Sequence, residues 1–130
     1  MTVCLDSWAV LEWLDGGEPA TTVVDRELEA GRPLMCTINI GEVTHQLERR
    51  HGHEKASAVV RELVGTVTLD EVTLDRVLAA ARIKAAHPIA FADCFAVATA
   101  VARSAVLLTG DPELLDRDLG CEMRDLRSVA

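Results

Sequence analysis

The chain has 130 residues, of which 49% are hydrophobic and 26% are charged, and its formal net charge is −8. This length suits a single domain spanning residues 1–130, and the hydrophobic content excludes a disordered chain. The most apolar stretch, 94–102, is far shorter than the roughly 20 residues of a membrane-spanning helix, which argues against a transmembrane protein. The first residues contain no basic and apolar leader, so we expect a cytoplasmic protein without membrane contact.

The first half of the chain alternates short apolar runs with longer amphipathic segments. The apolar runs predict strands, and the segments with apolar residues three or four positions apart predict helices. In chain order these elements are a strand at 3–5, helices at 7–14 and 21–30, a strand at 34–36, and helices at 39–50 and 54–64.

The second half continues the alternation. The predicted elements are a strand at 66–69, helices at 72–86 and 91–102, a strand at 106–108, a short helix at 112–115 and a last strand at 120–123. Helix 91–102 is apolar on almost every side, which is typical of a helix buried in the middle of a domain. Strands that alternate with helices indicate a parallel sheet covered on both faces. We therefore predict a three-layer α/β/α domain with a central parallel sheet of four to five strands.

Four acidic residues are expected at one rim of this sheet. Asp6 and Asp111 follow predicted strands, and Glu42 and Asp93 lie in the first turns of predicted helices. In open α/β sheets these positions all lie at the carboxyl edge, where ligands bind. Asp6 and Asp111 are also suited to capping helices, and Glu42 fits a capping box with Asn39. Both interpretations stay open for these three acids.

Asp93 is less easily explained by helix capping. It is the one charged residue of an apolar helix, and no lysine or arginine lies beside it in the sequence. A buried carboxylate must pair, take up a proton or meet a cation. Four carboxylates on one rim repel one another unless a cation lies between them, and oxygen ligands favour Mg²⁺ or Mn²⁺. The sequence therefore predicts a site for a divalent metal ion, which would lower the pKa of bound water.

The four acids in their local settings resemble those of the PIN-domain ribonucleases, in particular the VapC-type toxins of type II toxin–antitoxin pairs. The resemblance covers nearly the whole chain and rests on the order and spacing of four segments. These segments are Val3-Cys4-Leu5-Asp6-Ser7, Asn39-Ile40-Gly41-Glu42, Phe91-Ala92-Asp93-Cys94 and Leu108-Thr109-Gly110-Asp111-Pro112.

The resemblance implies roles for these residues. It would make Asp6 and Asp93 the main ligands of Mg²⁺ or Mn²⁺, with Glu42 and Asp111 completing the catalytic pocket directly or through water. The resemblance also gives supporting roles to Ser7, Asn39 and Thr109. Asp116 and Asp118 follow Asp111 closely, and either is an alternative to it.

The resemblance also implies a reaction and partners. The family hydrolyses an RNA phosphodiester with metal-activated water, which leaves 5′-phosphate and 3′-hydroxyl ends. Its toxins are usually homodimers, and a small antitoxin protein holds them inactive by covering the acidic groove. A toxin with a net charge of −8 suits an antitoxin arm rich in Arg or Lys, because opposite charges steer association.

The distribution of charge bears on RNA binding. The excess of 21 acidic over 13 basic residues argues against binding through bulk positive charge, but a metal ion held by acids inverts the local field. The most basic segment, 45–61, is typical of a solvated helical face. The alternative is a stripe that binds the RNA substrate, with Arg49 and Arg50 as its candidate contacts.

Three other functions are compatible with parts of the sequence. Paired histidines among His45, His51, His53 and His87 would allow acid–base cleavage without a metal. An aspartate-nucleophile phosphatase would use Asp6, but position 8 holds Trp8 where resemblance to that family requires a second aspartate. A flavodoxin-like binding module, or a degenerate PIN protein that only binds a partner, would use the acids as caps.

The four cysteines show no paired spacing typical of a metal site. Cys4, Cys36 and Cys121 lie in predicted strands and Cys94 lies in the apolar helix. Buried, reduced thiols are the interpretation that we favour over a zinc site.

Overall fold

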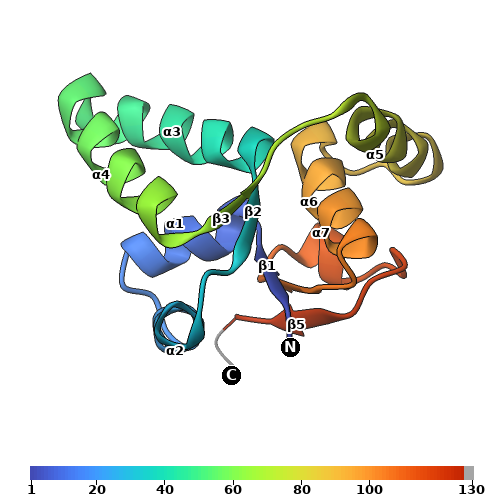
Figure 1. Cartoon of the computed structure of the whole chain (residues 1–130), viewed down its shortest axis with the longest axis horizontal. Helices are drawn as coiled ribbons and strands as arrows, with labels where there is room; N and C mark the ends of the chain where they lie inside the picture. The colour runs from blue at the N-terminus through green and yellow to red at the C-terminus, as the bar shows by residue number, and fades with distance from the viewer. Residues whose placement is uncertain (128–130) are drawn as a thin grey trace.

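Five parallel strands form one sheet in the computed structural model, which describes residues 1–127 (Figure 1). The strand order across the sheet is β3-β2-β1-β4-β5, and every neighbouring pair is parallel. In chain order the strands are β1 (Val3–Leu5), β2 (Leu34–Cys36), β3 (Thr68–Asp70), β4 (Val106–Thr109) and β5 (Met123–Asp125). The structure confirms the predicted parallel sheet and gives it five strands.

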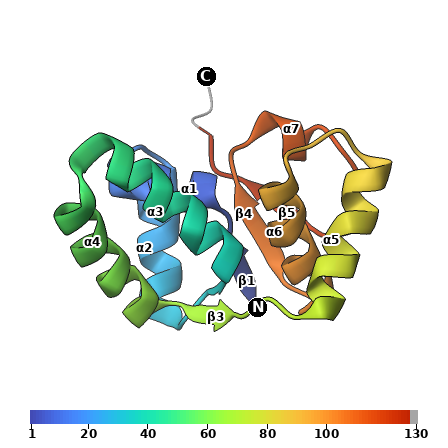
Figure 2. The same cartoon turned by 90° about the horizontal axis from the view of Figure 1, so that it is seen from above.

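Helices cover both faces of the sheet, as Figures 1 and 2 show. One layer holds α1 (Ser7–Leu14), α2 (Ala20–Ala30), α3 (Thr37–His51) and α4 (His53–Thr66). The other layer holds α5 (Leu74–Ala86), α6 (Phe91–Ala102) and the short α7 (Pro112–Leu115). The three-layer α/β/α prediction is therefore confirmed.

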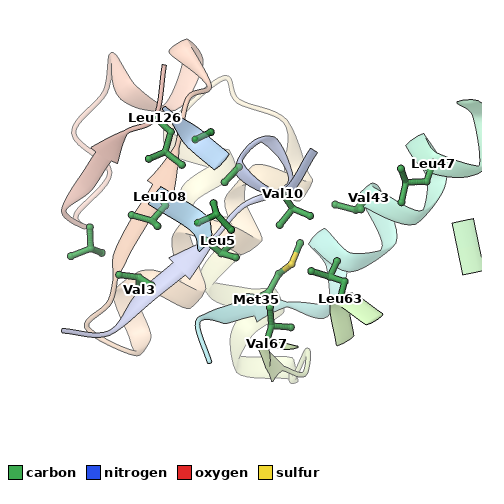
Figure 3. Close-up of a cluster of buried hydrophobic side chains, with 14 of the residues drawn as sticks. Val3, Leu5, Val10, Met35, Val43, Leu47, Leu63, Val67, Leu108 and Leu126 are labelled. Carbon is green, nitrogen blue, oxygen red and sulfur yellow. The ribbon is translucent and has the colours of Figure 1, made fainter. Parts of the chain in front are cut away.

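Each face of the sheet has its own hydrophobic core because alternate side chains of a strand point to opposite faces. Val3 and Leu5 of β1 belong to the core beneath α1–α4, which Figure 3 shows together with Met35 and Leu108. Cys4, between them, belongs to the core beneath α5–α7. Strands β1, β2 and β4 are buried along their whole length, which explains why they are nearly continuous apolar runs in the sequence.

The sheet changes direction between β1 and β4. From β1 the chain continues to β2 on one side, and it returns to the other side of β1 only with β4. Leu5 pairs with Leu108, so Asp6, which follows β1, lies beside Thr109, the last residue of β4. The carboxyl edge at such a switch point is where open α/β sheets form a crevice.

Some predicted boundaries differ from the structure. Helix α3 begins at Thr37, two residues before the predicted start. The chain passes directly from β2 into this helix, and no side chain caps its first turn. Strand β3 begins at Thr68 rather than 66, since α4 continues through Thr66. Strand β5 begins at Met123 rather than 120, after a turn in which Gly120 has φ +83°. Smaller shifts place the starts of α2, α4 and α5 at Ala20, His53 and Leu74.

Helix α6 is buried over seven consecutive residues, 94–100, as its apolar sequence predicts. Within residues 1–127 no single helix has the length and apolar composition needed to cross a membrane, although α5 and α6 meet the test together as a pair bent by 117°.

The four cysteines are free thiols. Cys4, Cys36 and Cys94 are buried and Cys121 is half-buried, which confirms the prediction of reduced thiols. Cys121 precedes β5 rather than lying in it.

Candidate active site

Asp6 is fixed where β1 passes into α1. Its carboxylate caps the helix by accepting a hydrogen bond from the Ala9 amide, with 2.8 Å between Oδ1 and N. Its other oxygen accepts a hydrogen bond from the Thr109 hydroxyl at the end of β4. The side chain is only 1% exposed. Asp6 is thus both a helix cap and a carboxylate held at the switch point of the sheet.

Glu42 projects toward the same edge from the second turn of α3. Its Oε1 accepts hydrogen bonds from the Ser7 hydroxyl and from Asn39 Nδ2, the latter over 3.1 Å. The predicted capping box is wrong, because α3 begins before Asn39 and has no side-chain cap. Ser7 and Asn39 instead both donate hydrogen bonds to Oε1 of Glu42 and so orient its carboxylate.

Asn39 also reaches the helix that carries Asp93. Its Nδ2 donates a second hydrogen bond over 3.1 Å to the backbone oxygen of Ala92, next to Asp93 at the start of α6. Asn39 is fully buried, and its Oδ1 is the one buried side-chain oxygen or nitrogen in residues 1–127 that has no hydrogen-bond partner. The amide therefore ties α3 to α6 directly beside the acids.

Asp93 and Asp111 lie close together with an acid that the sequence analysis did not single out. One carboxylate oxygen from each of Asp93, Asp111 and Glu113 lies within 4.8 Å of the other two. Asp111 caps α7 through the Glu113 amide, with 2.9 Å between N and Oδ1. The cluster does not include Asp116 or Asp118, so the structure favours Asp111 and adds Glu113 beside it.

The electrostatics of the site show how close the acids are. Burial raises the pKa of Asp6 to about 7, against the opposing hydrogen bonds from Thr109 and Ala9. Burial also raises the pKa of Asp93 to about 7, and the neighbouring negative charges add to the effect. For Asp93 these charges are those of Asp111, Glu42, Asp6 and Glu113. The charges of the other three predicted acids therefore all act on Asp93, although the close cluster of carboxylate oxygens within residues 1–127 contains Asp93, Asp111 and Glu113 and not Asp6 or Glu42.

The donor set fits a hard divalent cation. This group of acids, called the acidic pocket below, contributes carboxylates from the residue after β1, from α3 and α6, and from the loop after β4, and the cluster described above contains no thiol or imidazole. Oxygen-only ligand sets favour Mg²⁺ and Mn²⁺ over softer metals. A bound cation would offset the mutual repulsion that raises the pKa of Asp93.

Trp8 shapes the loop that carries Asp111. A Cβ placed on Gly110 would overlap the six-membered ring of Trp8, so the ring packs directly against the backbone between Thr109 and Asp111. Trp8 is half-buried and packs against the core beneath α1–α4. Trp8 is therefore a packing residue that links the core to this loop.

Another acid, Asp70, ends β3, but its charge is already neutralised by basic partners. Arg76 donates two hydrogen bonds to its carboxylate, with 2.8 Å from Nε and 3.0 Å from Nη2, and Thr99 and Arg103 add one each. Burial alone would raise the pKa of Asp70, but these partners outweigh burial and hold the pKa below its usual range. Asp70 thus stabilises the packing of α5 and α6 and has no oxygen to spare for a cation.

The two candidate RNA-contacting arginines have different surroundings. Arg50 forms an ion pair with Asp15, with 3.2 Å between Nη1 and Oδ2. Arg49 lines an open groove of about 520 Å³ on α3, and its guanidinium has no acceptor in the part of the chain that the structure describes. Only Arg49 therefore presents a free guanidinium.

The groups required by two alternative mechanisms are elsewhere. His45, His51 and His53 are exposed on α3 and at the start of α4, and His53 contacts Glu48 rather than another imidazole. The phosphatase considered above would also use a lysine to support Asp6; of the chain's two lysines, Lys55 lies on α4, and Lys84 donates a hydrogen bond to the backbone oxygen of Ile89 over 2.6 Å. Neither mechanism gains support from the structure.

Solved structures with this fold include toxin–antitoxin proteins. The chain is similar to VapBC from Salmonella typhimurium bound to DNA, with a TM-score of 0.78 and 17% identity over 97% of this chain and 98% of that one. It is also similar to VapBC2 from Rickettsia felis bound to a promoter DNA fragment, with a TM-score of 0.77 and 11% identity over 96% and 98%.

A third similar structure is that of a toxin alone. It is VapC20 from Mycobacterium tuberculosis, described as a sarcin–ricin loop cleaving toxin, with a TM-score of 0.69 and 19% identity over 92% of this chain and 98% of that one. At such identities the likeness concerns the fold. A search of curated proteins finds no match.

A family model covers most of the chain. The model of the PIN domain matches residues 3–118, a range that begins with β1 and includes all four predicted acids together with Glu113. The chain belongs to the PIN domain family.

Proposed function

We propose that this protein is a metal-dependent endoribonuclease of the VapC type, which acts as a toxin and is neutralised by a cognate antitoxin. The observation that carries the proposal is the grouping of acids at the switch point of the sheet: carboxylate oxygens of Asp93 and Asp111 lie within 4.8 Å of each other, and the charges of Asp6 and Glu42 also raise the pKa of Asp93. Four acids from distant parts of the chain, in mutual repulsion, are explained by a bound cation more simply than by helix capping.

The four acids have different proposed roles in binding the cation. Asp6 and Asp93 are the proposed main ligands of Mg²⁺ or Mn²⁺, and Glu42 and Asp111 complete the pocket directly or through water. When bound, the ion supplies positive charge that activates water and stabilises charge on the attacked phosphodiester. Thr109 orients the Asp6 carboxylate, and Ser7 and Asn39 orient that of Glu42.

The proposed partners follow from the same comparison. Several of the solved structures with this fold are toxin–antitoxin complexes, and a net charge of −8 suits an antitoxin with a basic arm. We further propose a homodimer in the cytoplasm, with residues 1–130 as one domain. Exposed apolar side chains on α5 and α6 support self-association, namely those of Leu74, Leu78 and Phe91.

The test is cleavage of total cellular RNA by the purified protein with Mg²⁺, with Mn²⁺ and with EDTA. The wild type and Asp93→Asn are compared, and circular dichroism establishes that the variant is folded. We expect cleavage that requires the metal and is lost in the folded variant. Cleavage that survives both EDTA and the substitution would contradict the proposal and redirect attention to the histidines.

A further inference from the structure

The groove on α3 begins beside the acidic pocket. It is lined by Gly41, Thr44, His45, Glu48 and Arg49, and Gly41 is the chain neighbour of Glu42. Glu42, His45 and Arg49 are three and four residues apart, so they lie on one stripe of the helix. With a rise of 1.5 Å per residue, this stripe extends about 10 Å from Glu42 to Arg49.

The charge of the groove differs from that of the pocket. Arg49 and His45 are exposed, and the Arg49 guanidinium has no ion pair or hydrogen bond within residues 1–127. Glu48, the one acid among the lining residues, lies 3.3 Å from His53 Nδ1. A guanidinium without a partner can bind a phosphate through two hydrogen bonds, so Arg49 offers a local positive site in a protein with a net charge of −8.

Gly41 keeps the floor of the groove open. A Cβ at this position would meet no atom within 4 Å, so the packing of the chain does not require a glycine here. Its φ is not in the left-handed region either, and α3 continues through it without interruption. The absence of a side chain at this position lets a ligand backbone approach α3 closely.

We propose that this groove binds the RNA strand that flanks the scissile bond. Arg49 contacts a phosphate about 10 Å from Glu42, His45 donates an N–H to the same backbone, and Gly41 leaves room for the strand to enter the pocket. The inference rests on the proposed ribonuclease function and assigns a substrate path to it. It assigns the RNA contact to Arg49 and not to its neighbour Arg50, whose guanidinium forms an ion pair with Asp15.

The first test measures binding of a short fluorescein-labelled single-stranded RNA of mixed sequence by fluorescence anisotropy in Mg²⁺. All proteins carry Asp93→Asn so that the RNA stays intact. We expect Arg49→Ala to weaken binding about three- to tenfold and to reduce the slope of log affinity against log salt by about 0.7. Arg50→Ala, the matched control, is expected to leave both quantities close to those of its parent.

The second test blocks the groove without removing charge. Gly41→Leu is compared with Gly65→Leu, because Gly65 is also an exposed helical glycine with no atom within 4 Å of an added Cβ. We expect both variants to keep or gain thermal stability and only Gly41→Leu to lose RNA affinity. With Asp93 restored, Arg49→Ala should raise KM and leave kcat nearly unchanged.

The outcomes separate this inference from the proposed function. If Arg49→Ala and Gly41→Leu bind RNA as well as their matched controls while the wild type cleaves RNA, the groove is not the substrate path and this inference is wrong. If the wild type cleaves no RNA but both variants still lose affinity, the groove binds RNA and the proposed nuclease is wrong.

Discussion

The ring of Trp8 packs directly over Gly110, in the space that any larger residue at position 110 would need. This contact connects the first turn of α1, which begins next to Asp6, to the loop between Thr109 and Asp111. Two of the site's acids are therefore positioned by one packing contact as well as by hydrogen bonds.

Gly110→Ala is expected to be destabilising. The added methyl group must displace either the Trp8 ring or the backbone after β4, and overpacking of this kind costs about 1–3 kcal/mol. Urea unfolding measures the free energy, and RNA cleavage by the folded fraction measures the displacement of Asp111. Gly31→Ala is the control because a Cβ there meets no atom within 4 Å. Equal stabilities of the two variants would contradict the role of Trp8.

Replacing Asn39 is expected to impair the site while the fold is kept. Asn39→Ala removes the hydrogen bonds to Glu42 and to the Ala92 backbone oxygen, and loss of such supporting contacts typically lowers metal affinity or activity 10- to 100-fold. Metal titration by calorimetry and RNA cleavage are the measurements. Gln46→Ala on the same helix is the control, and a similar loss in both variants would point to a general effect on α3.

The stability of the metal-free protein should fall as pH rises from about 4 to about 7. Burial raises the pKa of both Asp6 and Asp93 to about 7, so the folded state binds more protons than the unfolded state in this range, and deprotonation favours unfolding. Thermal melts in EDTA should show a decrease of several degrees. Mg²⁺ should reduce the decrease, and a melting temperature that rises with pH in EDTA would refute the explanation.

Asp70 is expected to matter for stability and not for catalysis. Asp70→Ala leaves Arg76, whose side chain is 15% exposed, without its main partner, and breaking a buried ion pair costs about 3–5 kcal/mol. Because partners lower the pKa of Asp70, its contribution to stability should be lost only when the pH falls through that lowered pKa. Urea unfolding tests the loss, and the cleavage rate per folded molecule should stay that of the wild type.

The sequence predicted the sheet well because buried parallel strands are short apolar runs. Strands β1 and β2 and helix α6 have the predicted bounds. The beginning of α3 was misjudged because Asn39 has the preferred chemistry of a helix cap, whereas its amide is turned inward to Glu42 and Ala92. Helix-capping propensity cannot distinguish a capping Asn39 from one whose amide is turned inward. The inward contact with Ala92 depends on a helix more than 50 residues away in the sequence.

The acids were found from their positions at strand and helix ends, but Glu113 was not. An acid in the first turn of a helix is common because of the helix dipole, so its type and position carry no special signal. What singles it out is the distance of its carboxylate oxygen from those of Asp93 and Asp111, which only the fold reveals. Asp116 and Asp118 also follow Asp111 within one short segment, but they lie outside this cluster.

The pairing of β1 with β4 has a consequence for how the protein is made. The hydrogen bond from Thr109 to Asp6 spans 103 residues, and the amide of Val106 is likewise bound to the oxygen of Thr2 over 2.9 Å. A growing chain therefore has Asp6 and Glu42 early but no complete pocket until β4 and the loop after it have left the ribosome. The parts of the site lie far apart in the sequence, so under the proposed function a partly synthesised chain that ends before β4 would not yet be able to cleave RNA.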